Sequence, residues 1–130
     1  RFGFVLSSSD DRSSAIACLG FEFYRQGLGI VQIQGIEGKQ DLLRPLRWEK
    51  LLVRTAVEYA RILELKHVLM PCAARHPYNP LYNSELRELA KLSQEECEAR
   101  AKRLYLAYDK TAEKCGFVYK PEWRAFALTL

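Results

Sequence analysis

Four cysteines and two histidines are the residues of this 130-residue chain whose chemistry could serve a metal site or a nucleophile. The cysteines are Cys18, Cys72, Cys97 and Cys115. No Cys-x-x-Cys pair and no Cys/His pair at zinc spacing occurs, so we expect no metal site. Cys72 lies between His67 and His76 and is the one candidate for an activated thiol. The alternative is that all four are small core residues in a reducing compartment, which indicates a cytoplasmic protein.

A helix that begins near residue 45 is the second feature that could bind a ligand. Apolar residues recur at spacings of three and four over about twenty positions, which predicts a helix over Pro45–Glu64. Pro45 suits the first turn, because its missing N–H is no loss there. A helix N-terminus carries partial positive charge, and Arg44 and Arg47 flank this one, so the pattern indicates attraction of anions.

Ahead of this helix, the sequence predicts three strands joined as an antiparallel meander. The expected strands are Phe2–Leu6, Ala15–Tyr24 and Leu28–Ile36. The polar run Ser7–Ser14 predicts a loop, and Arg25–Gly27 predicts a turn. Strict alternation in the third strand predicts one face with Gly29, Val31, Ile33 and Gly35 and another with Leu28, Ile30, Gln32, Gln34 and Ile36.

After the helix, the apolar run Lys66–Met70 predicts a buried strand parallel to the third one, because strand, helix and strand follow closely. A loop is expected over Ala73–Asn83, and then a short helix that Ser84 caps and that extends to Leu92. Ser93 and Glu96 match a capping box, which opens a long helix ending near Gly116. Two final strands are expected, at Phe117–Tyr119 and Ala125–Leu130.

These elements predict an α/β (α+β) fold with a mixed, mainly antiparallel sheet, a central βαβ unit and helices packed on the sheet. Hydrophobic residues make up 48% of the chain and charged residues 28%, which excludes a disordered segment and a disulfide mini-protein. No apolar run is long enough to span a membrane. The chain begins at Arg1 without a start Met, as a piece of a longer protein would.

The net charge of +4 is too small to indicate nucleic-acid binding. The last long helix carries a basic set, namely Arg100, Lys102, Arg103, Lys110 and Lys114. Glutamates intersperse this set, so we expect a solvated face of mixed charge and no nucleic-acid partner.

Two stretches resemble the Gcn5-related N-acetyltransferase family, whose members transfer an acetyl group from acetyl-CoA to an amine. Residues 51–61 with 65–69 are similar to the family's cofactor helix and the strand after it, and residues 112–117, Ala-Glu-Lys-Cys-Gly-Phe, resemble the end of its last helix. The likeness covers roughly residues 15 to 130. It implies a single domain over 1–130 that lacks the family's first strand and first two helices.

The resemblance also implies a site for acetyl-CoA or another acyl-CoA at the start of the cofactor helix. There the family has a Gln/Arg-x-x-Gly-x-Gly/Ala loop whose amides hold the pyrophosphate. The matching positions run from Leu43 to Trp48, and Arg44, Leu46, Arg47 and Trp48 are the implied cofactor-binding residues. Leu46 and Trp48 replace small residues, so Trp48 is expected to be largely buried and to crowd a phosphate off the backbone.

For catalysis, the resemblance implies a tyrosine acid in the last helix and, in some relatives, a general base after the third strand. The family's tyrosine position holds Ala112 here, which leaves Tyr108, one turn earlier, as the candidate acid. Glu37 is the candidate base. The alternatives for these two residues are a core tyrosine and a solvated loop carboxylate.

Two functions therefore remain open at this point. One is acyl-CoA-dependent transfer of an acyl group to a small-molecule amine, with a divergent cofactor site. The other is a degenerate, non-catalytic acetyltransferase-like module that binds a protein partner or serves a structural role. The missing glycines, tyrosine and helices together predict weak CoA binding and no useful turnover by this chain alone.

Overall fold

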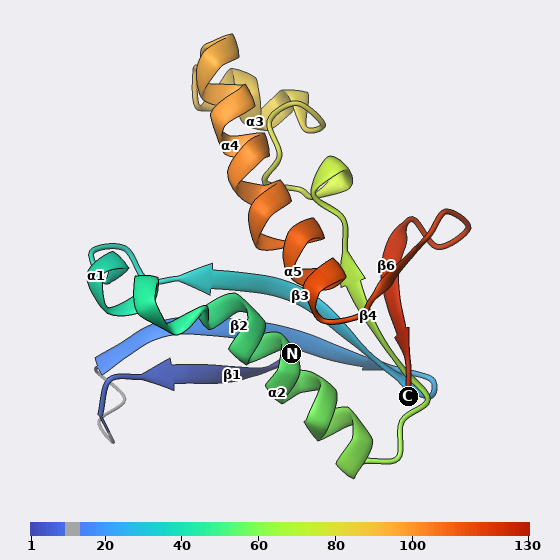
Figure 1. Ribbon diagram of the computed structural model, residues 1–130. Helices are drawn as coiled ribbons and strands as arrows, with labels where there is room; N and C mark the ends of the chain where they lie inside the picture. Colours follow the sequence, from blue (N-terminus) through green and yellow to red (C-terminus); the bar gives the residue numbers. More distant parts are fainter. Residues whose placement is uncertain (10–13) are drawn as a thin grey trace.

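The computed structural model describes residues 1–9 and 14–130 and contains a six-stranded mixed sheet, which confirms the expected fold class (Figure 1). The strand order is β1-β2-β3-β4-β6-β5, and all neighbours are antiparallel except β3 and β4. The strands are β1 (Phe2–Ser7), β2 (Ala15–Tyr24), β3 (Gly27–Gly35), β4 (His67–Pro71), β5 (Val118–Lys120) and β6 (Ala125–Thr129). Of the predicted loop Ser7–Ser14, Ser7 ends β1, and residues 10–13 lie outside the described residues.

A β-bulge at Val31 changes which residues of β3 share a face. Gln32 pairs with Gly20, but Ile30 pairs with Phe21, so Val31 is the extra residue. Leu28, Ile30 and Ile33 are consequently all buried in the core cluster. Strict alternation predicted that Ile33 lies on the other face of the strand from Leu28 and Ile30, and this prediction was therefore wrong. The bulge also bends β3 at the point where it leaves its parallel neighbour.

The predicted helix over Pro45–Glu64 is divided into shorter elements. They are α1 (Gln40–Leu43), the 3-10 turn η2 (Arg44–Leu46) and α2 (Trp48–Ile62). Arg47 has a φ of 45° and separates η2 from α2, so Pro45 lies in the 3-10 turn and Trp48 is the first residue of α2. Helix α2 lies across one face of the sheet (Figure 1). Its buried residues are Leu52, Val53, Ala56, Val57 and Ala60, which face the sheet in the core cluster.

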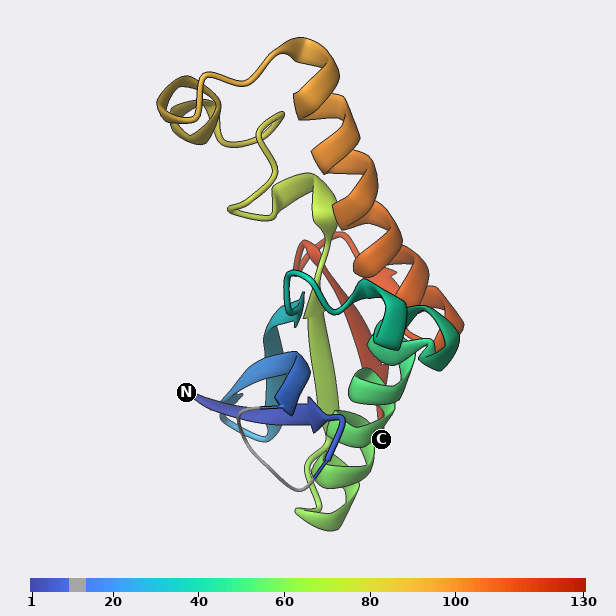
Figure 2. The same ribbon diagram turned by 90° about the vertical axis from the view of Figure 1, so that its left-hand side faces the viewer.

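The C-terminal half contains η3 (Ala73–Arg75), α3 (Ser84–Leu89), α4 (Gln94–Ala107) and α5 (Asp109–Lys114). The Ser93–Glu96 capping box is present at the start of α4, as predicted, whereas α3 is capped by Asn83 and not by Ser84. Gly116 has a φ of 84° and ends α5, which suits glycine because the left-handed region strains other residues. Helix α4 rises obliquely from the sheet and carries α3 at its far end (Figures 1 and 2).

The predicted long helix is interrupted at Tyr108, between α4 and α5. Tyr108 has φ −101° and ψ −66°, and its side chain is 2% exposed. Strands β3 and β4 pair only from Gly27 to Gly29, and β3 then continues away from β4. The Tyr108 hydroxyl accepts the N–H of Ile33 at 2.9 Å, so the tyrosine partners an amide of β3 beyond the end of the parallel pairing.

Replacing Tyr108 with Phe should lower the free energy of unfolding by about 1–3 kcal/mol, because a buried amide loses its acceptor. Urea denaturation measures this loss. Tyr119→Phe is the matched control, since Tyr119 is 42% exposed on β5, and it should change stability by less than about 0.5 kcal/mol. Equal losses in the two variants would contradict a structural role for the Tyr108 hydroxyl.

Candidate functional site

A cavity of about 700 Å³, here called the apolar cavity, lies between the end of β3, the start of α2 and the face of α4. Its lining is mostly apolar, with three ionisable side chains besides the tyrosines. The lining residues are Ile33, Gln34, Gly35, Trp48, Glu49, Tyr78, Leu86, Arg100, Arg103, Leu104, Leu106, Ala107 and Tyr108. An apolar cavity with a few polar groups is the usual form of a small-molecule site.

A second cavity of about 920 Å³, here called the basic cavity, lies at the N-terminus of α2 beside α5. Its lining residues are Arg44, Arg47, Glu49, Lys50, Leu106, Lys110, Thr111 and Lys114. Within the part of the chain that the structure describes, Lys110 alone among these five cations forms an ion pair, with Glu113 at 3.4 Å. No side chain caps the N-terminus of α2, so helix and cations together create a positive potential.

Much of the expected mixed-charge face of the last helix is therefore part of the cavity walls. Arg100 and Arg103 line the apolar cavity, and Lys110 and Lys114 line the basic cavity. Arg103 and Lys114 are exposed, as the sequence pattern indicated, but that pattern did not reveal the elements that pack beside the helix.

Trp48 begins α2, as expected, but it is less buried than the sequence analysis predicted. It is partly buried, and its ring packs over Gly35, where an added Cβ would approach Trp48 Cζ2 to 3.3 Å and Leu43 Cδ1 to 3.0 Å. Trp48 lines the apolar cavity and a smaller one near α1, but it does not line the basic cavity. Because Trp48 shares the smaller cavity with Arg44 and Arg47, the expected crowding of a phosphate there stays a prediction.

Glu49 is a functional candidate that the sequence reasoning missed. It is the second residue of α2 and lines both the apolar and the basic cavity. Burial raises the pKa of its carboxyl, while its own backbone N–H and the charge of Lys114 lower it in part. A carboxylate with a raised pKa is a better base. The sequence offered one signal for Glu49, namely its position directly after Trp48 on the predicted helix.

Tyr108 lines the apolar cavity and keeps a proton there. Burial raises the pKa of its phenol, so the hydroxyl stays protonated at neutral pH. Because its oxygen accepts the Ile33 N–H, its own O–H remains available to donate. Ala112, the residue that the resemblance aligned with a tyrosine, is fully buried one turn later.

Glu37 and Leu46 are not brought into these cavities. Glu37 is exposed in the turn after β3, and Leu46 is 45% exposed in η2. Neither residue lines the apolar or the basic cavity, whereas Arg44 and Arg47 line the basic one. The candidate base that the structure places with Tyr108 is thus Glu49.

His76 packs against the inner side of this site. Its ring centroid lies 4.6 Å from that of Tyr108, and its exposed fraction is 3%. Nδ1 accepts the N–H of Tyr78, which puts the ring proton of the neutral form on Nε2. Nε2 is buried without a partner among the described residues, and burial lowers the pKa of the imidazole. Asn79 holds this loop by donating to the carbonyl of Ala73 at 2.8 Å.

The four cysteines are free thiols in this arrangement. Cys72 is buried, and its thiol donates to the carbonyl of Arg124 at 3.5 Å. Among the described residues, no three His, Cys, Asp or Glu side chains are grouped so that they could hold a metal ion. Within residues 1–9 and 14–130, no helix is both long and apolar enough to cross a membrane.

Comparisons with protein-family models, with curated proteins and with solved structures found no match.

The buried, neutral His76 predicts a loss of stability on acidification. The stabilising contribution of neutral His76 is complete above the ordinary histidine pKa of about 6.5, which the unfolded chain has. It is lost as the pH falls through the lowered pKa of the folded state, because the unfolded chain binds a proton that the folded chain does not. The melting temperature of wild type, measured as a function of pH, should fall over this range, and it should fall less in His76→Asn. The same pH dependence of the melting temperature in wild type and in His76→Asn would count against the assignment.

Proposed function

We propose that this chain is an acetyltransferase-like domain that binds an acyl-CoA through side-chain cations. The observation that carries the proposal is that the basic and apolar cavities meet at Glu49, at the uncapped N-terminus of α2. A ligand with a polyanionic end and an apolar arm fits that pair of cavities. A cytoplasmic location agrees with the four free thiols.

The five cations of the basic cavity would hold the phosphate groups of CoA. Arginine forks bind phosphate oxygens bidentately, and lysines act as point charges. These contacts substitute for the glycine-loop amides that the family uses, since Leu46 and Trp48 leave no such loop. Three of the five cations, Arg44, Arg47 and Lys50, come from one short segment, while Lys110 and Lys114 come from α5.

When bound, an acyl-CoA supplies an activated thioester carbonyl. Glu49 would accept a proton from the attacking amine at its carboxylate, which lines both cavities. Tyr108 would donate its hydroxyl proton to the departing thiolate. Trp48, Leu104 and Ala107 are part of the apolar lining that would limit access of water to this region.

The second candidate function is a non-catalytic acetyltransferase-like module, and one observation favours it. The Tyr108 hydroxyl already accepts the Ile33 N–H at 2.9 Å, and this contact accounts for the tyrosine as a structural residue. In that case the cavities would bind a ligand or a partner without turnover.

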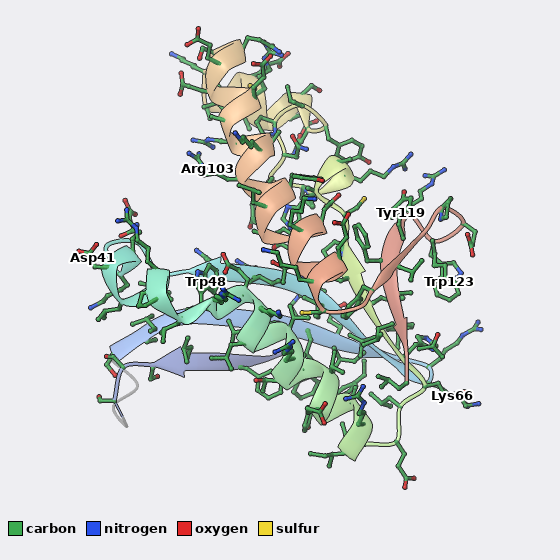
Figure 3. The ribbon with its side chains drawn as sticks, in the orientation of Figure 1. Asp41, Trp48, Lys66, Arg103, Tyr119 and Trp123 are labelled. Carbon is green, nitrogen blue, oxygen red and sulfur yellow. The ribbon has the colours of Figure 1, made fainter. Side chains whose placement is uncertain are left out.

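Calorimetric titration with CoA tests the binding step. Lys114→Glu and Arg47→Glu should each weaken CoA binding at least tenfold, because each places a negative charge against the phosphates. Dephospho-CoA should bind more weakly than CoA for the same reason. Lys66→Glu is the control: Lys66 is exposed at the far end of the sheet from Trp48, and this variant should bind like wild type (Figure 3).

An absence of CoA binding by wild type, or equal effects of Lys66→Glu and Lys114→Glu, would contradict the proposal. A thiol-release assay with acetyl-CoA and a panel of amines then separates the two candidate functions. Turnover that is lost in Glu49→Gln while CoA binding persists supports the enzyme, and binding without turnover supports the module.

A further inference from the structure

Two arginines of α4 face the apolar cavity without an acidic partner. Arg100 and Arg103 both line it, and neither forms an ion pair within residues 1–9 and 14–130. They are three residues apart and therefore neighbours on one side of the helix. In Figure 3, the Arg103 side chain leaves α4 on the side where α1 and Trp48 lie.

The walls around these arginines are mostly apolar, and the arginines could pair with an anionic ligand. Leu86, Leu104, Leu106, Ala107 and Trp48 line the same cavity, so the apolar body of a ligand there would contact apolar side chains, although Leu106 and Arg103 are also exposed to solvent. A hydrogen bond between a guanidinium and a carboxylate is charge-assisted and therefore stronger than one between neutral groups. Guanidinium groups match the geometry of a carboxylate, which can accept two parallel N–H bonds.

The cavity's single carboxylate does not satisfy them. Glu49 is the only acidic residue of the lining, and it stands at the junction with the basic cavity, where Lys114 is the cation that acts on its pKa. The arginines and Glu49 therefore provide two separate polar contacts, joined by apolar walls.

We propose that the apolar cavity binds an organic acid, with its apolar body against Trp48 and Leu104 and its carboxylate on Arg100 and Arg103. If the chain is an acyltransferase, this compound is the acceptor, a carboxylate-bearing amine whose amino group faces Glu49. The acceptor role rests on the proposed function, whereas the binding of the acid does not require CoA.

Trp48 lines the cavity, so its fluorescence can report binding there. The chain has two tryptophans, and Trp123 is 52% exposed in the turn between β5 and β6, so Trp123→Phe leaves Trp48 as the sole indole reporter. The probes are 4-phenylbutyrate and 4-phenyl-1-butanol, which share the apolar body and differ in the carboxylate. Fluorescence titration without CoA should show the acid binding at least tenfold more tightly than the alcohol.

Arginine variants in the Trp123→Phe background locate the contact. Arg103→Ala and Arg100→Ala should each weaken 4-phenylbutyrate binding at least tenfold and change 4-phenyl-1-butanol binding less than about threefold. Lys102→Ala is the matched control, because Lys102 is an exposed cation on the same helix that lines neither cavity, and it should bind both probes as the parent does. Far-UV circular dichroism checks that each variant is folded.

Equal affinities for the two probes, no binding of either, or an equal loss in Lys102→Ala would overturn the proposal. The CoA titration separates this result from that of the proposed function. The chain could bind the acid through Arg103 and yet not bind CoA. That result would support the organic-acid site and would exclude only its role as the acceptor site. CoA binding that depends on Lys114, without any preference for the acid, overturns the organic-acid site alone.

Discussion

The hydrogen bond between the Tyr108 hydroxyl and the Ile33 N–H is the contact around which this fold is arranged. Strands β3 and β4 pair over only three residues, so beyond Gly29 the amides of β3 that point away from β2 need other partners. Tyr108 reaches Ile33 from the junction of α4 and α5, and α4 rises obliquely from the sheet. The apolar cavity lies in the angle that results, bounded by β3 and α4.

The electrostatics of the site follow from the same arrangement. Helix α5 packs beside α2, which brings Lys110 and Lys114 to the segment that carries Arg44, Arg47 and Lys50. Like charges so placed repel one another, which costs stability unless an anion binds. The uncapped N-terminus of α2 adds to the same field.

Trp48 is accommodated by a glycine on the neighbouring strand. Its ring packs on β3 because Gly35 has no side chain to oppose it. The indole therefore forms part of the wall of the apolar cavity and stays out of the basic cavity. Gly35 and Trp48 are separated in the sequence by twelve residues, which include α1 and η2.

Local patterns in the sequence determined the elements. The Ser93–Glu96 capping box, the left-handed Gly116 and the apolar run before Pro71 depend on neighbouring residues alone, and the parallel pairing of β3 with β4 followed from their spacing. The tertiary structure alone decided the bulge at Val31, the break at Tyr108 and the meeting of Glu49 with cations from α5. Each of these depends on contacts between residues far apart in the chain, whose energies exceed the local preference for a regular strand, an unbroken helix or a solvated charge.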